Sequence, residues 1–306
     1  MEESKILFDL IKEEKFNELI KIIKRKGHEL DLNIKDESGN HLITYAIIKN
    51  NIATVKVLLD NNCRIDIIDQ EGRSILYTPI KYNYNKIVDL IINYNEKSIG
   101  VSITDFRDNK NNIPLHYAIF FKNIDAIDIL LKNNSNVNLI DENNNTSLHL
   151  AVYTKNYNIC KKLLDASLNT NINIRTGNGE TALHIACNLE LTDIVKLLLD
   201  NKIDIDAKDY DMQLTALMYT IHNNNNELAK ILIDHGADPN IQDFVGNTVI
   251  HHAIKENNNE ILLKLLSSDK TKTLINLNFH NIDSKFPIHL FLENELINNN
   301  ILKILI

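Results

Sequence analysis

The sequence predicts an all-α fold, a solenoid of stacked helix pairs separated by short β-turn fingers, and three observations carry this prediction. A segment with Leu, His and Ala at fixed offsets returns about every thirty-three residues. Some dozen residues later comes an apolar run with helical spacing, such as residues 194–199, and a polar loop such as residues 235–240 closes the unit. The clearest copies of the first segment are residues 112–118, 145–151, 180–186 and 247–253.

Each unit is expected to begin with a turn and a first helix. Thr146, Thr181 and Thr248 stand where an N-cap hydroxyl can accept hydrogen bonds from the free amide groups of a helix start. Pro114 and Pro287 occupy the following position, where proline is tolerated because that N–H has no helical partner. The first helix of each unit should therefore start at this point.

A second helix should follow in each unit, because apolar residues recur at a spacing near 3.6 residues. Ile159, Leu163 and Leu164 show this spacing in one unit. A helix with one apolar stripe must bury that stripe against another element. Helix pairs are therefore expected to pack side by side.

Together these features resemble the ankyrin repeat, whose signature at this period is Thr-Pro-Leu-His-x-Ala followed by two helices. The resemblance implies a stack of repeats that bury their apolar faces against one another and expose one long binding surface. Aligned on the turn residue, the units begin near positions 36, 69, 108, 141, 176, 209, 243 and 281. Two wider spacings predict insertions at residues 95–105 and 267–279, and the sixth turn holds one extra residue.

The two ends of the chain depart from this pattern. Residues 1–35 contain two helical stretches without the signature, so we expect a degenerate N-terminal capping repeat there and the ankyrin repeats over residues 36–306. The last unit is expected to be incomplete, because the apolar run 301–306 has no polar loop or capping helix after it. Two hypotheses follow: the natural protein continues beyond residue 306, or an otherwise monomeric chain pairs with a second copy through this helix.

Composition and charge exclude several classes of partner. The formal net charge is −8, acidic residues dominate residues 193–243, and no basic stripe suited to nucleic acid is present. No apolar run approaches the roughly 18 residues that span a bilayer, and the N-terminus has no secretory signal. The three cysteines, Cys63, Cys160 and Cys187, form no pair at metal or redox spacing, which indicates a reducing compartment. We therefore expect a cytoplasmic protein without nucleic-acid or membrane partners.

The sequence also predicts no enzyme, with no catalytic, cofactor-binding or metal site. A metal ion needs three or four ligands that converge on one point. The repeated histidines should instead lie one repeat apart, each bonding locally within its own turn, as the ankyrin resemblance implies. They are His116, His149, His184, His251 and His289. Phosphate-binding, serine-hydrolase and zinc-protease motifs are absent from the sequence.

The ankyrin resemblance places the usual binding surface on the concave face, which finger tips and inner-helix ends form. Tyr82, Phe120, Phe121 and Tyr153 fall at corresponding offsets in three consecutive units, so we expect an aromatic patch there. The alternative is that individual members fill gaps between inner helices. The other expected partner-binding residues are Arg73, Lys110, Asn112, Asn145, Glu180, Tyr210 and Phe244.

These observations predict a non-catalytic scaffold that binds a protein partner, whose identity the sequence leaves open, on its concave face. Aromatic anchors and a polar rim would hold the partner, and the acidic second half favours a partner with a basic patch. The chain holds 46 Asn and 47 Ile, a bias typical of an AT-rich genome, so a viral or pathogen effector acting in the host cytoplasm is one hypothesis. The alternative is a targeting module of a larger enzyme or ubiquitin-ligase adaptor that continues beyond residue 306.

Overall fold

The computed structural model describes residues 2–27, 29–95, 102–166, 170–267, 275–293 and 301–303. Both predicted insertions and the apolar run 301–306 fall partly outside these described residues. The chain divides into two compact units, which we call the N-terminal unit, Met1–Glu142, and the C-terminal unit, Asn143–Ile306. Each unit repeats one motif: a finger-like turn, an inner helix and an outer helix.

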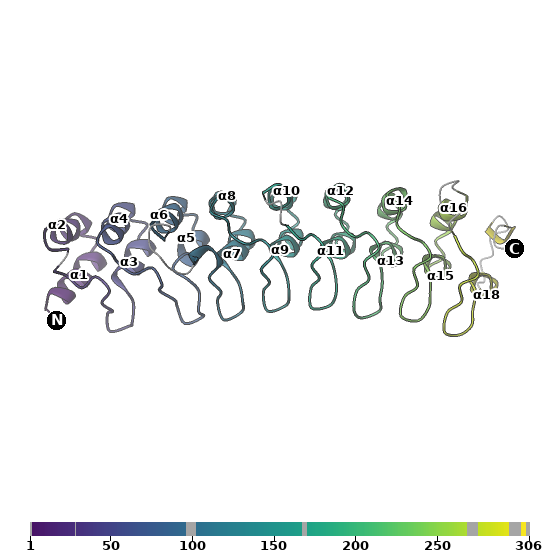
Figure 1. Ribbon diagram of the computed structural model, residues 1–306, viewed down its shortest axis with the longest axis horizontal. Helices are drawn as coiled ribbons and strands as arrows, with labels where there is room; N and C mark the ends of the chain where they lie inside the picture. The colour runs from purple at the N-terminus through teal and green to yellow at the C-terminus, as the bar shows by residue number, and fades with distance from the viewer. Residues whose placement is uncertain are drawn as a thin grey trace. The chain divides into compact units, whose positions relative to one another are not determined.

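The helices of the N-terminal unit form an inner and an outer layer (Figure 1). Each helix packs against the next one in its own layer and against its partner in the other layer. A short 3-10 helix, η1 (Ile103–Asp105), packs against α6 and α7. The inner helices are α1 (Glu2–Lys12), α3 (Leu42–Ile48), α5 (Tyr77–Lys81) and α7 (Pro114–Phe120), and the outer helices are α2 (Phe16–Lys26), α4 (Ile52–Asp60), α6 (Asn85–Asn95) and α8 (Ile124–Lys132).

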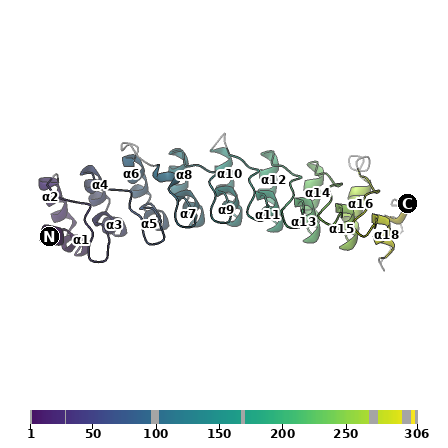
Figure 2. The ribbon, with the colours of Figure 1, turned by 60° about the horizontal axis from the view of Figure 1, so that its bottom comes forward.

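The C-terminal unit has the same two layers, which a second view separates (Figure 2). Its inner helices are α9 (Ser147–Tyr153), α11 (Ala182–Asn188), α13 (Ala216–His222), α15 (Val249–Lys255) and α18 (Pro287–Leu292), and its outer helices are α10 (Tyr157–Asp165), α12 (Thr192–Asp200), α14 (Asn226–Asp234) and α16 (Asn259–Ser267). The described part of the chain contains no β-strand, and its extended segments form only isolated bridges such as Lys35 with His41.

The fingers are tight turns that their first residue holds closed. The N–H of Asp243 donates to the carbonyl oxygen of Asn247 at 2.9 Å. In return, Oδ1 of Asp243 accepts from the N–H groups of Val245 and Asn247 at 3.0 and 2.7 Å. A short acceptor side chain is needed here because these amide groups would otherwise have no partner. Asp36, Asp69 and Asp108 make the same contacts in their own fingers.

Each finger also needs one residue in the left-handed backbone region. Gly246 has φ 80° and Gly179 has φ 82°, three residues after the turn residue. Asn111 and Asn144 adopt φ 59° at the same offset, since asparagine tolerates this region better than other non-glycine residues. The sixth finger reaches the left-handed region one residue later, at Gln213, which confirms the predicted extra residue.

His184 and His251 hold both their own helix and the next repeat. The N–H of Thr181 donates to Nδ1 of His184 at 3.2 Å, and Nε2 of His184 lies 3.1 Å from the carbonyl oxygen of Leu214. An amide N–H only donates and a carbonyl only accepts, so the imidazole is neutral with its proton on Nε2. His251 makes the corresponding link to Lys285 at 3.2 Å. The prediction of local bonding was therefore incomplete, because these histidines also bind the following repeat.

The N-terminal and cysteine predictions have different outcomes. The predicted capping region holds α1 and α2, which pack against α3 and α4, while its role as a cap stays a prediction. All three cysteines are buried and unpaired, and burial raises the pKa of Cys63 and of Cys160 to about 12. At neutral pH they are buried thiols, which pack as small apolar side chains.

Replacement of His184 by Leu is expected to lower the free energy of unfolding by about 2 kcal/mol or more. The change introduces an apolar side chain of similar size and leaves the Thr181 N–H and the Leu214 carbonyl group without partners. Urea unfolding measures the effect. The matched control is His235→Leu, which removes one exposed hydrogen bond to the Ile231 carbonyl oxygen of the same helix and should lower stability by no more than about 1 kcal/mol. Equal effects of the two substitutions would contradict the assigned link.

Candidate partner-binding surfaces

Aromatic side chains gather on α5 and α7 and on the residues that follow these helices in the N-terminal unit. We call this set the aromatic cluster. Its two most exposed rings are Phe120 and Tyr82, with 72% and 55% of their surface exposed. The cluster comprises Tyr77, Lys81, Tyr82, Tyr84, Tyr117, Phe120 and Phe121.

The half-buried ring of Phe121 packs against the exposed ring of Phe120. The ring centres of Phe120 and Phe121 lie 5.2 Å apart in an edge-to-face arrangement. Phe121 in turn meets Tyr77 at 5.9 Å, and Tyr77 meets Tyr117 at 4.8 Å, both edge-on. Such pairs are favourable because the positive edge of one ring faces the negative face of the other. Phe120 is therefore held by a chain of packed rings that joins α5 to α7.

Lys81 links Tyr77 to Tyr82 within the cluster. Its Nζ lies 5.9 Å from the ring centre of Tyr77 and 5.4 Å from that of Tyr82. Tyr82 also stacks on Tyr84, with ring centres 5.8 Å apart. Tyr77 and Lys81 stand four residues apart on α5, a spacing that puts side chains on one helix face. That spacing is the signal by which the sequence could have indicated the missed Tyr77.

The predicted patch has mixed outcomes. Tyr82 and Phe120 are exposed, whereas the half-buried Phe121 packs against Tyr77, which is the gap-filling alternative. Tyr153 ends α9 in the C-terminal unit with 47% of its surface exposed. Its participation in one patch with the other three stays a prediction.

Arg73 is already engaged within the protein. Its Nε lies 2.7 Å from Oδ2 of Asp69, and its Nη2 lies 3.0 Å from Oε2 of Glu71. The guanidinium carbon stands 3.8 Å from the ring centre of Tyr77, a cation–π contact. The structure therefore gives Arg73 a positioning role beneath the aromatic cluster, while contact with a partner stays a prediction.

The other predicted finger residues divide into exposed and structural ones. Lys110 is exposed and pairs with Glu142 at 3.1 Å. The side-chain amide of Asn112 donates to Asp108 and helps to close its own finger. Tyr210 and Phe244 are exposed on their fingers, and Asn145 and Glu180 are half-buried. Binding of a partner by any of them stays a prediction.

A second use of the turn carboxylate joins several fingers to their inner helices. The hydroxyl of Tyr45 donates to Oδ2 of Asp36 at 2.6 Å, and this bond, with Lys12 nearby, holds the pKa of Asp36 down to about 2. Tyr219 makes the same bond to Asp209 at 2.9 Å, and Tyr117 bonds Asp108. The finger surfaces are therefore held by side chains on the inner helices.

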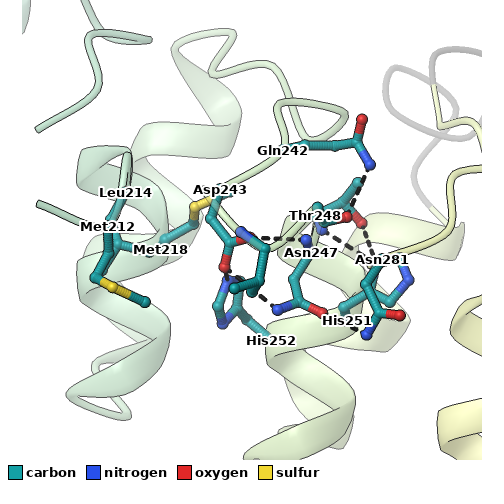
Figure 3. Close-up of polar contacts among 12 residues, drawn as sticks. Met212, Leu214, Met218, Gln242, Asp243, Asn247, Thr248, His251, His252 and Asn281 are labelled. Carbon is teal, nitrogen blue, oxygen red and sulfur yellow. Dashed lines mark hydrogen bonds and ion pairs between the residues drawn. The ribbon is translucent and has the colours of Figure 1, made fainter. Parts of the chain in front are cut away.

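The seventh finger replaces this tyrosine with a histidine pair. Nε2 of His252 lies 2.9 Å from Oδ2 of Asp243, beside the Asn247 amide that also bonds Asp243 (Figure 3). Nδ1 of His252 lies 2.9 Å from Nε2 of His222 on α13. The carboxylate only accepts, so in the neutral pair His252 carries its proton on Nε2 and accepts from His222. Burial lowers the pKa of His252 to about 4, with the neighbouring His222 acting in the same direction.

Acid is expected to weaken the protein through His252. Unfolded, this imidazole binds a proton near pH 6.5, but folded it does so only near pH 4. Between these pH values the unfolded chain binds more protons than the folded chain. The free energy of unfolding is therefore unaffected by His252 above pH 6.5 and decreases as the pH falls toward 4. One such group contributes a slope of about 1.4 kcal/mol per pH unit.

His252→Tyr restores the residue that bonds the turn carboxylate in other repeats, and it should reduce the pH slope of the unfolding free energy by about that amount. Urea unfolding across this pH range measures the slope. The variant should unfold cooperatively above pH 6.5, which checks that it folds. A slope equal to that of the unaltered chain would show that His252 is not the responsible group.

The described residues hold no group of three or more His, Cys, Asp or Glu side chains placed to bind a metal ion. Nor does any described helix have the length and apolar character that a membrane crossing requires.

Comparison with known proteins identifies the repeating motif. A family model described as ankyrin repeats in three copies matches residues 7–105, 95–176, 115–209, 168–243 and 208–276. The chain is 36% identical over 256 residues to an ankyrin repeat protein of Acanthamoeba polyphaga mimivirus, covering 83% of this chain and 33% of that protein. It is 26% identical over 136 residues to an ankyrin repeat protein of fowlpox virus, covering 42% and 31%. It is 28% identical over 191 residues to inversin of Mus musculus, covering 61% and 18%.

Among solved structures, the ankyrin repeat domain of Bcl-3, a member of the IkappaB protein family, matches with a TM-score of 0.59. The identity is 20%, and the match covers 87% of this chain and 98% of that domain, so the likeness shows the fold alone.

The fold and its finger surfaces thus define a repeat protein of the protein–protein interaction class. The chain belongs to the ankyrin repeat family, and the predicted all-α ankyrin-repeat fold is confirmed. It spans about a third of the length of the viral relatives it matches.

Proposed function

We propose that this ankyrin repeat protein is a non-catalytic scaffold that binds a protein partner on the face shared by fingers and inner helices, the face expected to be concave. The exposed rings of Phe120 and Tyr82 are the observation that carries the proposal. Large apolar rings are costly to leave in water, and their burial dominates many interfaces. The aromatic cluster is the proposed anchor.

The packing beneath the anchor supports this role. Phe121 and Tyr77 hold Phe120, and Tyr84 and Lys81 contact Tyr82, before any partner arrives. A side chain that is already ordered loses less conformational entropy on binding. The aromatic cluster is therefore suited to tight contact with an apolar groove or peptide on the partner.

The viral relatives support the hypothesis that the chain is a viral effector working in the host cytoplasm. Because the chain spans only a third of those relatives, we keep the alternative that it is the recruiting module of a larger enzyme or ubiquitin-ligase adaptor. In both proposals the chain recognises a partner protein and has no catalytic role. A monomeric chain is the proposed state, with self-pairing as the alternative.

The double substitution Tyr82→Ala and Phe120→Ala is expected to weaken partner binding by at least about 2 kcal/mol, or roughly 30-fold. Affinity capture from candidate host lysates with mass spectrometry identifies the partner, and calorimetry with the purified partner measures affinity. Stability should change by no more than about 0.5 kcal/mol per exposed position.

The matched control is Tyr157→Ala, which removes an exposed tyrosine from the outer helix α10 and should leave the affinity unchanged. A folded double variant that binds the partner as tightly as the unaltered chain would refute the proposed anchor.

A further inference from the structure

One position in each finger changes character along the chain. It is the residue directly after the turn residue, and it is Glu37, Gln70, Asn109, Glu142 and Gly177 in the first five fingers. In the last three fingers it is Tyr210, Phe244 and Ile282, which we call the apolar finger row. Their exposed fractions are 63%, 67% and 72%. Three large apolar side chains therefore face solvent at equivalent places in consecutive repeats of the C-terminal unit.

The backbone fixes where these side chains stand. The N–H of Tyr210 donates to the carbonyl oxygen of Asn178 in the preceding finger at 2.9 Å. Phe244 and Ile282 repeat this bond at 2.9 and 3.0 Å to the fingers before them. Each row residue thus sits at the junction of two fingers, so the row forms one ordered line across them.

Tyr210 also depends on a specific glycine. A Cβ atom on Gly179 would stand 2.4 Å from the tyrosine ring, so only glycine lets the ring lie against the preceding finger. On its other side, Arg175 stands 5.7 Å from the ring centre and donates to the carbonyl oxygen of Lys208 at 2.7 Å. Tyr210 is therefore held in place while most of its surface stays open.

An acidic pocket of about 500 Å³ adjoins the row at Tyr210. Glu180, Asp209 and Asp211 line it together with Tyr219 and Met212, and its lining includes no Lys or Arg. Burial and the neighbouring Asp209 raise the pKa of Glu180, which indicates that the pocket lacks a compensating cation.

Two exposed carboxylates extend this charge along the row. Asp211 lies beside Tyr210 and Asp283 beside Ile282, and neither forms an ion pair with a described residue. The row thus combines apolar surface with an acidic border, which is complementary to a segment that is both apolar and basic.

We infer that the apolar finger row and its acidic pocket form a docking surface for an extended segment of a partner protein that carries apolar residues and at least one Lys or Arg. An extended segment presents alternate side chains to one face, so it can place several apolar groups along a line. A cationic side chain entering the pocket would meet Glu180 and Asp211 and the face of Tyr210. Nucleic acids and anionic membranes would be repelled by the same carboxylates.

This inference rests on the proposed function as an interaction module but not on the aromatic cluster, which lies in the N-terminal unit. The test selects random peptides displayed on phage against the purified chain. Enriched peptides should combine apolar residues with Lys or Arg. Calorimetry with the synthetic peptide should show at least a tenfold loss of affinity for the double variant Phe244→Ser and Ile282→Ser.

A charge variant keeps the test independent of the apolar substitutions. Glu180→Gln with Asp211→Asn should also weaken peptide binding about tenfold and flatten its dependence on salt. Glu142→Ser, at the equivalent position of an earlier finger, and Phe120→Ala, in the aromatic cluster, should bind as the unaltered chain does. Circular dichroism confirms that each variant is folded.

Three outcomes would overturn the inference. They are no enriched peptide, enriched peptides without Lys or Arg, or a peptide that binds the apolar double variant and the charge variant as tightly as the unaltered chain. Failure of the aromatic cluster to bind a partner would leave these outcomes untouched, so the two proposals fail separately.

Discussion

The buried imidazole that joins one repeat to the next is the contact on which the structure depends. His184 and His251 each accept a hydrogen bond from a threonine amide at a helix start and donate one to a carbonyl oxygen some thirty residues further along the chain. The bond therefore sets the start of the inner helix and the position of the following finger together. The fingers lie outside the packed helices, so this link and the turn carboxylates are what hold their surfaces in place.

Much of the fold could be predicted because the repeat itself carries the information. Thr181, His184 and the apolar stripe of the outer helix are all visible at fixed offsets, and so is the extra residue of the sixth finger. The second bond of His184 and of His251 could not be predicted, because its carbonyl partner becomes a neighbour only when repeats stack. The tyrosine or histidine nine residues after Asp36, Asp108 and Asp243 was visible as a pattern but had no assigned role.

The candidate site was harder to predict for a different reason. Phe120 and Phe121 are neighbours in sequence, yet one ring faces solvent and the other packs against Tyr77. Successive side chains at a helix end point in different directions, and small differences in packing decide which one is exposed. The same applies to Arg73, whose place on a finger tip suggested a partner contact but whose charge is satisfied by Asp69 and Glu71. Exposure at a surface depends on neighbouring repeats, and composition alone does not encode it.

The bond that places each finger against the one before it uses main-chain atoms only. Any residue with an amide hydrogen can occupy that site, and this chain already uses Asn, Glu, Gly, Tyr, Phe and Ile there. Proline alone among the standard residues is barred. Selection can therefore change the exposed side chain at this position while the bond between fingers is kept, provided that the preceding finger leaves room, as Gly179 does for Tyr210. An organism whose protein targets change would then be able to alter the binding surface of such a protein without altering its fold.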